Sequence, residues 1–375
     1  MIVNETKTKC MCIGSNHSPS LFFNEKKIEA VESYKYLGAL LSQHATIKGD
    51  LFSKDYDYLC TQAHKAMFAL NKKVEFASPI PVQLMIKLFD SLIKPILTYG
   101  SDIWGIRESA RLLIDTFQRK FLKFHLKVKG STPDYMVYGE SGVFPISNVI
   151  LANVFACYHR LSNMPCIYLA KRVFESLSRI SILGSHNWIQ WVKSEAHKRQ
   201  INLDMNIPNK KFKKMCIETL NRQFKKKWLD EINDTSASRS RLYRVIKGPF
   251  EMEPYLHVVT NEKHRSALSQ FRCSSHHLAI ETGRWRKPRP IPKQLRICRL
   301  CKVIEDEFHF IVQCAQYKKQ RAELNNAIFQ LLGEDFITFK QNFFDNVLTS
   351  RNKIIMRALA KFIFKAFQAL NDLKS

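Results

Sequence analysis

Four potential metal ligands stand close together in the last third of the chain. The stretch CRLCKVIEDEFHFIVQC contains Cys298, Cys301, His309 and Cys314 in the pattern C-x2-C-x7-H-x4-C. Two cysteines separated by two residues can face one ion from a tight turn, and the later histidine and cysteine complete a tetrahedral set. Because the set is complete without a solvent position, the pattern predicts a structural zinc ion rather than a catalytic one.

The same window allows other interpretations. Cys298 and Cys301 could be reduced surface thiols, with His309 packed between two phenylalanines, but the other seven cysteines are scattered without comparable grouping, which favours a metal site. The acidic residues 305–307 are predicted to form a solvated loop between the ligand pairs, rather than to act as general acids or bases. A zinc deaminase would require H-x-E and P-C-x-x-C, and the sequence contains neither.

The charge of the chain indicates a polyanionic partner. Its 59 Lys and Arg against 33 Asp and Glu leave a net charge of +26. No run of 18 apolar residues is present, so the sequence predicts no transmembrane segment, and peripheral membrane binding is the less favoured alternative. The first ten residues, MIVNETKTKC, contain no apolar signal core. We therefore expect an intracellular protein of the nucleus, the cytoplasm or both, with reduced thiols and an oligomeric state that the sequence does not indicate.

Hydrophobic periodicity predicts short strands first and helices afterwards. Brief alternating runs fill the first 45 residues, as in hairpins. From Asp55 the apolar residues recur at three- and four-residue steps, which predicts three helices and thus a small bundle. The predicted apolar stripes are Leu59, Ala63, Ala66, Met67, Leu70 and Val74; then Leu84, Leu88, Leu92 and Ile96, with Pro95 expected to kink or end the helix; then Leu113, Phe117, Phe121, Phe124 and Val128.

A basic helix is predicted in the middle of the chain. In PNKKFKKMCIETLNRQFKKKWLDEI, apolar residues sit four apart and lysines, including Lys225, Lys226 and Lys227, surround them. This pattern is typical of an amphipathic helix. Its basic face either is simply solvated or follows a phosphate backbone, and both interpretations remain open.

A second basic run leads directly into the metal ligands. Prolines at 288, 290 and 292 keep this run extended, which suits tracking a strand rather than building a core. Cations for phosphates beside an aromatic ring for stacking are the usual means of gripping RNA. The predicted nucleic-acid-binding residues here are Arg284, Trp285, Arg286, Lys287, Arg289, Arg296 and Arg299.

The fold class predicted from these patterns is mainly α with a small β portion. Two further helices are expected after the ligands, at 321–332 and 352–373, the second burying Ile355, Leu359, Phe362, Ile363, Ala366 and Leu370. The chain is thus divided into strands at 1–45, a three-helix bundle at 46–140, a basic helical linker at 141–265, the basic run with its zinc knuckle at 266–320, and carboxy-terminal helices at 321–375.

Several of these segments, in this order, resemble the carboxy-terminal part of non-LTR (LINE-type) retrotransposon reverse transcriptases. The segments are VNETKTKCMCIG, VESYKYLGALLS, QAHKAMFALN, LFDSLIKPILTYGSDIWG, and FRCSSHHLAIETGRW followed by CRLC and EDEFHFIVQC. The resemblance covers nearly the whole chain. It implies a palm remnant with a primer-grip strand at 1–45, a thumb in the helical bundle, and the family's terminal cysteine-histidine region.

The resemblance also implies particular nucleic-acid contacts. Tyr36, Leu37 and Gly38 would occupy the primer grip, and Lys7 or Lys9 would belong to the motif that follows the polymerase active site. A grip strand without the rest of its palm would leave an open sheet edge in residues 1–45.

The residues of polymerase catalysis are missing from the sequence. Reverse transcription needs carboxylates that hold a pair of magnesium ions, and the family places two of them in an F/Y-x-D-D turn. No Asp-Asp pair occurs in the 375 residues, and the fingers and most of the palm would precede Met1. We therefore expect this chain alone not to be catalytic, with magnesium bound only by a full-length parent.

Three hypotheses follow. The first is a carboxy-terminal fragment whose thumb and zinc knuckle grip RNA or an RNA/DNA hybrid. The second is that the chain is part of an intact RNA-directed DNA polymerase. The third is a host protein recruited from such an element as a zinc-dependent RNA-binding or scaffold protein without an enzymatic role.

Overall fold

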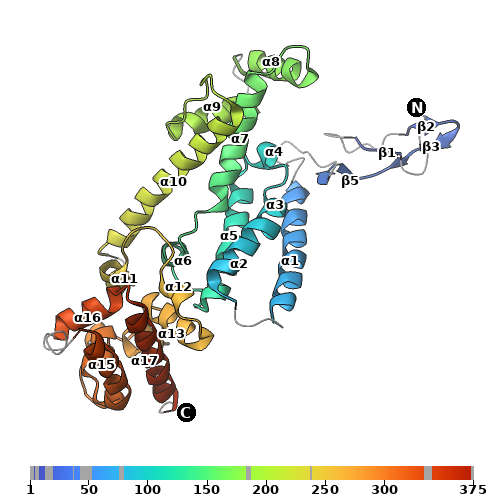
Figure 1. Cartoon of the computed structure of the whole chain (residues 1–375). Helices are drawn as coiled ribbons and strands as arrows, with labels where there is room; N and C mark the ends of the chain where they lie inside the picture. The colour runs from blue at the N-terminus through green and yellow to red at the C-terminus, as the bar shows by residue number, and fades with distance from the viewer. Residues whose placement is uncertain are drawn as a thin grey trace. The chain divides into compact units, whose positions relative to one another are not determined.

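The protein consists of helices and a few short strand pairs (Figure 1), as the sequence predicts. The computed structural model describes residues 4, 8–12, 20–36, 38–42, 53–75, 80–182, 187–236, 239–332 and 340–372. Its contacts group into two compact units, each built from three separate stretches of chain. The first unit comprises 1–76, 88–117 and 146–220, and the second comprises 77–87, 118–145 and 221–375.

Each sheet in the described part of the chain has only two strands. Parallel pairing joins β1 (Lys9–Cys10) to β4 (Glu29–Ala30), and antiparallel pairing joins β2 (Phe22–Phe23) to β3 (Lys26–Lys27). Within VESYKYLGALLS, β5 (Ser33–Tyr36) and β6 (Ala39–Ser42) form an antiparallel hairpin. The chain reverses there because Gly38 adopts a φ of +95°, which a side chain would disfavour.

Long helices build the first unit, and two of them continue into the second. The continuing helices are α5 (Glu108–Leu126) and α10 (Asn209–Asn233). The others of the first unit are α1 (Ser53–Glu75), η1 (Phe89–Ile93), α3 (Lys94–Leu97), α4 (Ser101–Trp104), α7 (Ile146–Ser162), α8 (Leu169–Ile182) and α9 (Trp188–Lys198).

The second unit contains further helices, several of which pack against the last one, α17 (Lys353–Asp372). The others are α2 (Val82–Leu88), α6 (Asp134–Ser141), α11 (Ser240–Ile246), α12 (Tyr255–Val258), α13 (Glu262–Arg272), α14 (Ala279–Thr282), η2 (Lys293–Leu295), η3 (His309–Gln313), η4 (Ala315–Tyr317), α15 (Lys318–Leu332) and α16 (Lys340–Thr349). Among the described residues, no single helix is long and apolar enough to cross a membrane, and only α6 and α7 taken together as a bent pair reach that length and composition.

The second predicted helix buries a different face from the one expected. Leu84 and Leu92 are 45% and 52% exposed, so the predicted stripe was wrong. The buried residues follow one position later, at Met85, Phe89, Ile93 and Leu97.

A widened turn before Pro95 accounts for this spacing. Proline lacks an N–H group and its ring crowds the preceding turn, and the helix accommodates it with the π-helical turn η1. The N–H of Lys94 accordingly donates to the carbonyl of Phe89, five residues back. In a regular α-helix, steps of four residues drift by about 40° each around the axis. The wider turn reduces this drift, so residues spaced by four stay on the buried face.

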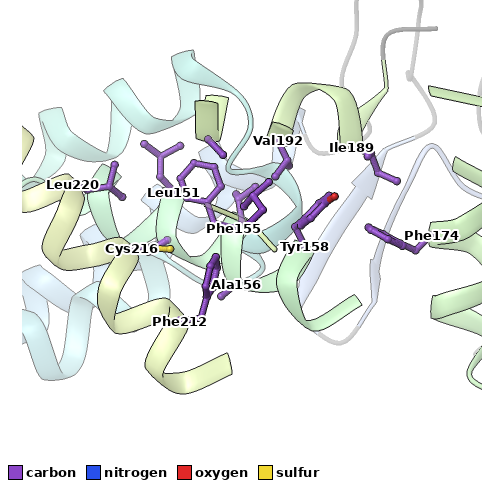
Figure 2. Packing of buried hydrophobic residues seen from close by; sticks show 14 residues of the cluster. Leu151, Phe155, Ala156, Tyr158, Phe174, Ile189, Val192, Phe212, Cys216 and Leu220 are labelled. Atoms are coloured by element: carbon purple, nitrogen blue, oxygen red, sulfur yellow. The ribbon is translucent and has the colours of Figure 1, made fainter. Parts of the chain in front are cut away.

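The core of the first unit lies between α7, α9 and α10 (Figure 2). Phe155 and Ile189 are fully buried, and the ring of His159 stacks on that of Phe212 with 4.2 Å between centroids. Burying each large apolar side chain contributes about 1.5–3 kcal/mol. The predicted four-residue stripe of α10 is confirmed for Phe212, Cys216, Leu220 and Trp228, all buried.

The core of the second unit is formed by α17 and the elements around it. All six residues predicted to be buried on this helix are buried. Rings from other segments pack on it: the centroid of Phe310 lies 5.7 Å from those of both Phe362 and Phe271. Aromatic pairs at this separation each add about 0.5–1.5 kcal/mol beyond the area they bury.

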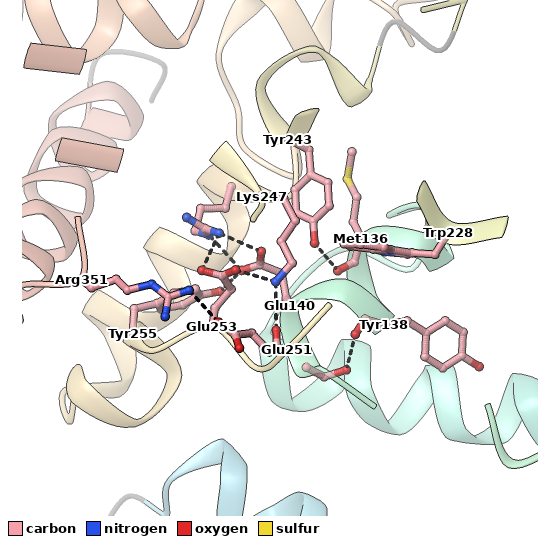
Figure 3. A network of polar contacts seen from close by, with 12 residues as sticks. Met136, Tyr138, Glu140, Trp228, Tyr243, Lys247, Glu251, Glu253, Tyr255 and Arg351 are labelled. Atoms are coloured by element: carbon pink, nitrogen blue, oxygen red, sulfur yellow. Dashed lines mark hydrogen bonds and ion pairs between the residues drawn. The ribbon is translucent and has the colours of Figure 1, made fainter. Parts of the chain in front are cut away.

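A buried ion network joins α6 to α13 within the second unit (Figure 3). The guanidinium of Arg272 donates to both oxygens of Glu140, at 3.0 and 3.1 Å, and lies 2.9 Å from a Glu253 oxygen. Lys247 donates to Glu253 at 2.5 Å, and the hydroxyl of Tyr255 donates to Glu140 at 2.7 Å. Burial opposes the charge of Arg272, but Glu140 and Glu253 outweigh it and raise the pKa well above its usual value.

Candidate metal centre

The four predicted ligands converge on one point in the second unit. One ligand atom from each of Cys298, Cys301, His309 and Cys314 lies within 4.8 Å of all the others. Sγ of Cys314 is 3.9 Å from Sγ of Cys298 and 3.9 Å from Sγ of Cys301. Two thiolates on a tetrahedral ion with zinc–sulfur bonds of about 2.3 Å would be about 3.8 Å apart. The group is therefore one that can hold a metal ion.

A tight turn brings the first two cysteines together. Ile297 and Ile304 form an antiparallel bridge around it, and the N–H of Cys298 donates to the carbonyl of Val303 at 2.7 Å. Lys302 closes the turn with a φ of +60° and donates its N–H to the carbonyl of Cys298. The two intervening residues, Arg299 and Leu300, are exposed, whereas Cys298 is buried.

A helical turn supplies the other two ligands. The side chain of Asp306 accepts the N–H of His309 at 2.9 Å and so caps the start of η3. At the other end, the N–H of Cys314 donates to the carbonyl of His309 at 2.8 Å. This single π-helical turn brings both side chains to the same side.

The polar atoms of the cluster are buried and lack protein partners that would neutralise them. Cys298 and Cys314 are each 1% exposed, and neither ring nitrogen of His309 meets the geometry of a hydrogen bond to a described residue. Burial, assisted by the charge of Cys298, raises the pKa of Cys314 to about 12. Burial likewise lowers the pKa of His309, despite the opposing influence of Gln313. A cation among these atoms would stabilise the thiolates and use the unpaired imidazole nitrogen.

The acidic residues between the ligand pairs do not form a solvated loop, which corrects the prediction from sequence. Glu307 is 2% exposed, forms an ion pair with Arg241, and lies 3.2 Å from Nε2 of His276. Burial alone would raise the pKa of Glu307, but His276 and Arg241 outweigh it and hold the value at about 2. Glu305 is 8% exposed, and its Oε2 accepts the N–H of Ala279 at 2.6 Å. Both carboxylates are buried because partners from distant segments satisfy them.

The ligand segment is fastened to the helices around it. Arg321 of α15 donates to the carbonyls of Ile311 at 2.6 Å and Cys314 at 2.8 Å. Phe310, next to the ligand His309, is fully buried in the aromatic core. The metal centre is therefore continuous with the core of the second unit.

The basic run before the ligands divides into two groups. Arg284 pairs with Glu281 at 3.0 Å, and Arg296 donates to the carbonyls of Ile291 and Ile280, each at 2.8 Å. These two cations hold the local fold together. Four others are exposed and form no ion pair with any residue that the structure describes: Arg286, Lys287, Arg289 and Arg299.

Trp285 presents its ring at the surface beside these cations. It is 64% exposed, and the guanidinium of Arg239 lies 5.5 Å from its centroid. An exposed indole next to unpaired cations can stack on a nucleobase.

The lysines predicted on α10 are exposed, with partial local pairing. Lys227 lies 3.8 Å from Glu231 one turn later, and the ammonium of Lys225 lies 5.7 Å from the ring centroid of Phe144. Lys226 is also exposed. These positions suit either a solvated face or a phosphate contact.

The candidate residues near the amino terminus belong to the first unit, whereas the metal centre belongs to the second. Lys9 pairs with Glu29 across the β1–β4 pair. Tyr36 is 60% exposed at the end of β5, and a Cβ on Gly38 would lie 3.1 Å from the ring of Tyr99. Lys7 and Leu37 lie outside the described residues.

Sequence reasoning missed two polar side chains beside the metal centre. They are Glu305 and Gln316, which line a cavity of about 830 Å³ together with parts of the basic run. The acidic stretch 305–307 was the one available signal, but nothing in its spacing identifies a buried position. No protein-family model and no curated protein matches this chain.

Proposed function

We propose that this chain is the nucleic-acid-binding, carboxy-terminal part of a LINE-type RNA-directed DNA polymerase. In this proposal the thumb-like helices and the zinc knuckle grip RNA or an RNA/DNA hybrid. The ion held by Cys298, Cys301, His309 and Cys314 is zinc with a structural role. The chain has no polymerase carboxylates of its own, and magnesium belongs to a full-length parent.

One observation carries the proposal: the metal centre and a set of unneutralised cations share one compact unit. Arg286, Lys287, Arg289 and Arg299 are exposed without ion-pair partners among the described residues, next to the exposed Trp285. Cations that serve only solubility are commonly interspersed with acidic residues. A cluster left unpaired beside an aromatic ring suits phosphates and bases instead. The net charge of +26 agrees with this assignment.

Zinc is proposed because the donor set suits it. Three thiolates and one imidazole in a closed tetrahedral arrangement favour zinc over magnesium or calcium, which prefer oxygen ligands. Metal analysis of the purified chain should find one equivalent of zinc. Another metal at full occupancy would contradict this part of the proposal.

The salt dependence of RNA binding tests the nucleic-acid assignment. Fluorescence anisotropy with a labelled single-stranded RNA measures Kd from 50 to 300 mM salt. Each phosphate contact contributes about 0.7 to the slope of log K against log salt. Replacing the four unpaired cations by alanine should therefore reduce the slope by about 3, and should weaken binding to all RNA sequences alike.

The matched control removes four exposed cations from the first unit instead: Arg172, Arg179, Lys193 and Lys198. This variant loses the same charge and should retain most of the slope. Equal losses in both variants would indicate attraction by net charge only and would contradict a specific interface.

A further inference from the structure

A cavity of about 830 Å³ opens in the second unit beside the metal centre. Its walls come from α14, the basic run, the turn between Cys298 and Cys301, Glu305, Gln316 and the end of α17. This volume falls within the range of about 300–1,000 Å³ that is usual for small-ligand sites.

Part of the cavity lining consists of aliphatic side chains that are exposed to solvent. Leu295 is 65% exposed, Ile297 41% and Leu300 60%, and all three line the cavity. An exposed aliphatic wall inside a cavity suits the flat face of an aromatic ring.

Two unpaired cations stand on the same wall. Arg286 and Arg299 line the cavity, are exposed, and form no ion pair with the residues described. The third cation, Arg296, is fixed to backbone carbonyls. These two guanidinium groups would complement a phosphate group on a ligand whose aromatic ring packs on the aliphatic residues.

Two polar groups of the cavity residues have capacity left for a ligand. Glu305 uses Oε2 to accept the N–H of Ala279, and its Oε1 accepts no hydrogen bond from a described residue. The amide Nε2 of Gln316 is buried and has no partner among the residues described. The Nε2 of Gln316 is therefore a buried donor that a ligand could satisfy, whereas Oε1 of Glu305 is an acceptor open to one.

We propose that this cavity binds one unpaired nucleotide of single-stranded RNA, whose base donates an exocyclic amino group to Glu305 and whose phosphate contacts Arg286 and Arg299. The inference rests on the proposed function and adds a base preference to it. A carboxylate accepts a hydrogen bond from the amino group of cytosine but meets the carbonyl O4 of uracil unfavourably. The site thus selects cytosine over uracil, two pyrimidines of equal size.

The test compares two labelled RNA dodecamers, oligo(rC) and oligo(rU), with the full zinc-loaded chain at pH 7.5 and constant salt. Oligo(rC) should bind about tenfold more tightly, the discrimination typical of one good base contact. Glu305→Gln supplies the matched variant. Its amide oxygen still accepts the N–H of Ala279, while its NH₂ group now donates to O4 of uracil, so the preference should vanish or reverse.

Leu295→Ser probes the apolar wall at an exposed position and should weaken binding of both dodecamers at least threefold. Ile354→Ser, at an isoleucine of the second unit that is 51% exposed and lies outside the cavity, should change neither. Zinc content and circular dichroism establish that each variant is folded. If Glu305→Gln loses zinc, the effect of Leu295→Ser on binding of the two dodecamers tests the cavity instead.

Each outcome bears on a different claim. Equal affinity of the native chain for both dodecamers, or an unchanged preference in Glu305→Gln, overturns the nucleotide cavity and leaves RNA binding intact. Failure to bind either dodecamer overturns the proposed function together with the cavity.

Discussion

Phe310 places its ring 5.7 Å from that of Phe362 on α17, and the residue before it, His309, is a member of the metal-binding group. Loss of the ion should therefore loosen the aromatic core as well as the ligand loop. Structural zinc commonly contributes on the order of 10 kcal/mol of apparent binding free energy to its module.

The first prediction concerns the metal. Cys301→Ser should lose the bound ion and lower the melting temperature of the second unit, because three ligands bind zinc far less tightly than four. Metal analysis and thermal unfolding measure both effects. Cys166→Ser, at an exposed cysteine outside the group, should keep one equivalent of zinc. Stoichiometric zinc in Cys301→Ser would refute the ligand assignment.

The second prediction concerns the buried ion network. Arg272→Met should lower the free energy of unfolding by about 3–5 kcal/mol, because it leaves the buried Glu140 without its counter-ion. Urea unfolding measures the change. Combining it with Glu140→Gln should recover part of the loss. Arg351→Met removes an ion pair from a largely exposed arginine and should cost at most about 1 kcal/mol.

The third prediction concerns pH. Burial lowers the pKa of His125 to about 4, with the charge of Lys127 as the next cause, against an ordinary value of 6.5. Between these two pH values, His125 is therefore protonated in the unfolded chain and neutral in the folded chain. Stability is complete above pH 6.5 and should fall as the pH decreases from 6.5 to about 4, by on the order of 3 kcal/mol.

His125→Phe removes this titration while preserving a ring between its aromatic neighbours Phe121 and Phe124. The difference in unfolding free energy between the two proteins, measured from pH 7.5 to 4, isolates the histidine. A constant difference across that range would be inconsistent with a lowered pKa.

The fourth prediction concerns the widened helical turn. Phe89→Ala should cost about 3–5 kcal/mol, because the ring is only 2% exposed. Leu92→Ala, three residues later and 52% exposed, should cost less than about 0.5 kcal/mol. Similar losses of unfolding free energy in the two variants would contradict the burial of Phe89 over Leu92.

Periodicity predicted the buried face of some regular helices but not of all, since Leu113 and Phe124 of the third predicted stripe are 38% and 54% exposed. The buried stripes of α10 and α17 follow from their spacing alone, because an uninterrupted α-helix returns the same face every 3.6 residues. The stripe around Pro95 failed because steps of four residues from Leu84 and from Met85 fit the sequence alike, and only the tertiary fold decides which face is buried. The hairpin within VESYKYLGALLS turns at Gly38, whose positive φ a side chain would disfavour.

The metal ligands were predictable because their spacing is local. Their surroundings were not, since Glu307 meets Arg241 and His276 only through the tertiary fold. For the same reason, the sequence does not distinguish Arg284, which pairs with Glu281, from the unpaired Arg286 two residues later. Charge density can be counted in a sequence, whereas the availability of each charge depends on its neighbours in space.

Arg299 and Leu300 stand between Cys298 and Cys301, so an ion held by these two cysteines would anchor a wall of the cavity at both ends. Metal binding and ligand binding in the cavity would then be thermodynamically linked. Whatever factor the metal adds to the affinity for a ligand in the cavity, the ligand must add to the affinity for the metal. A saturating ligand would thus slow the removal of the ion by a chelator, and the retention of the ion would report how full the cavity is.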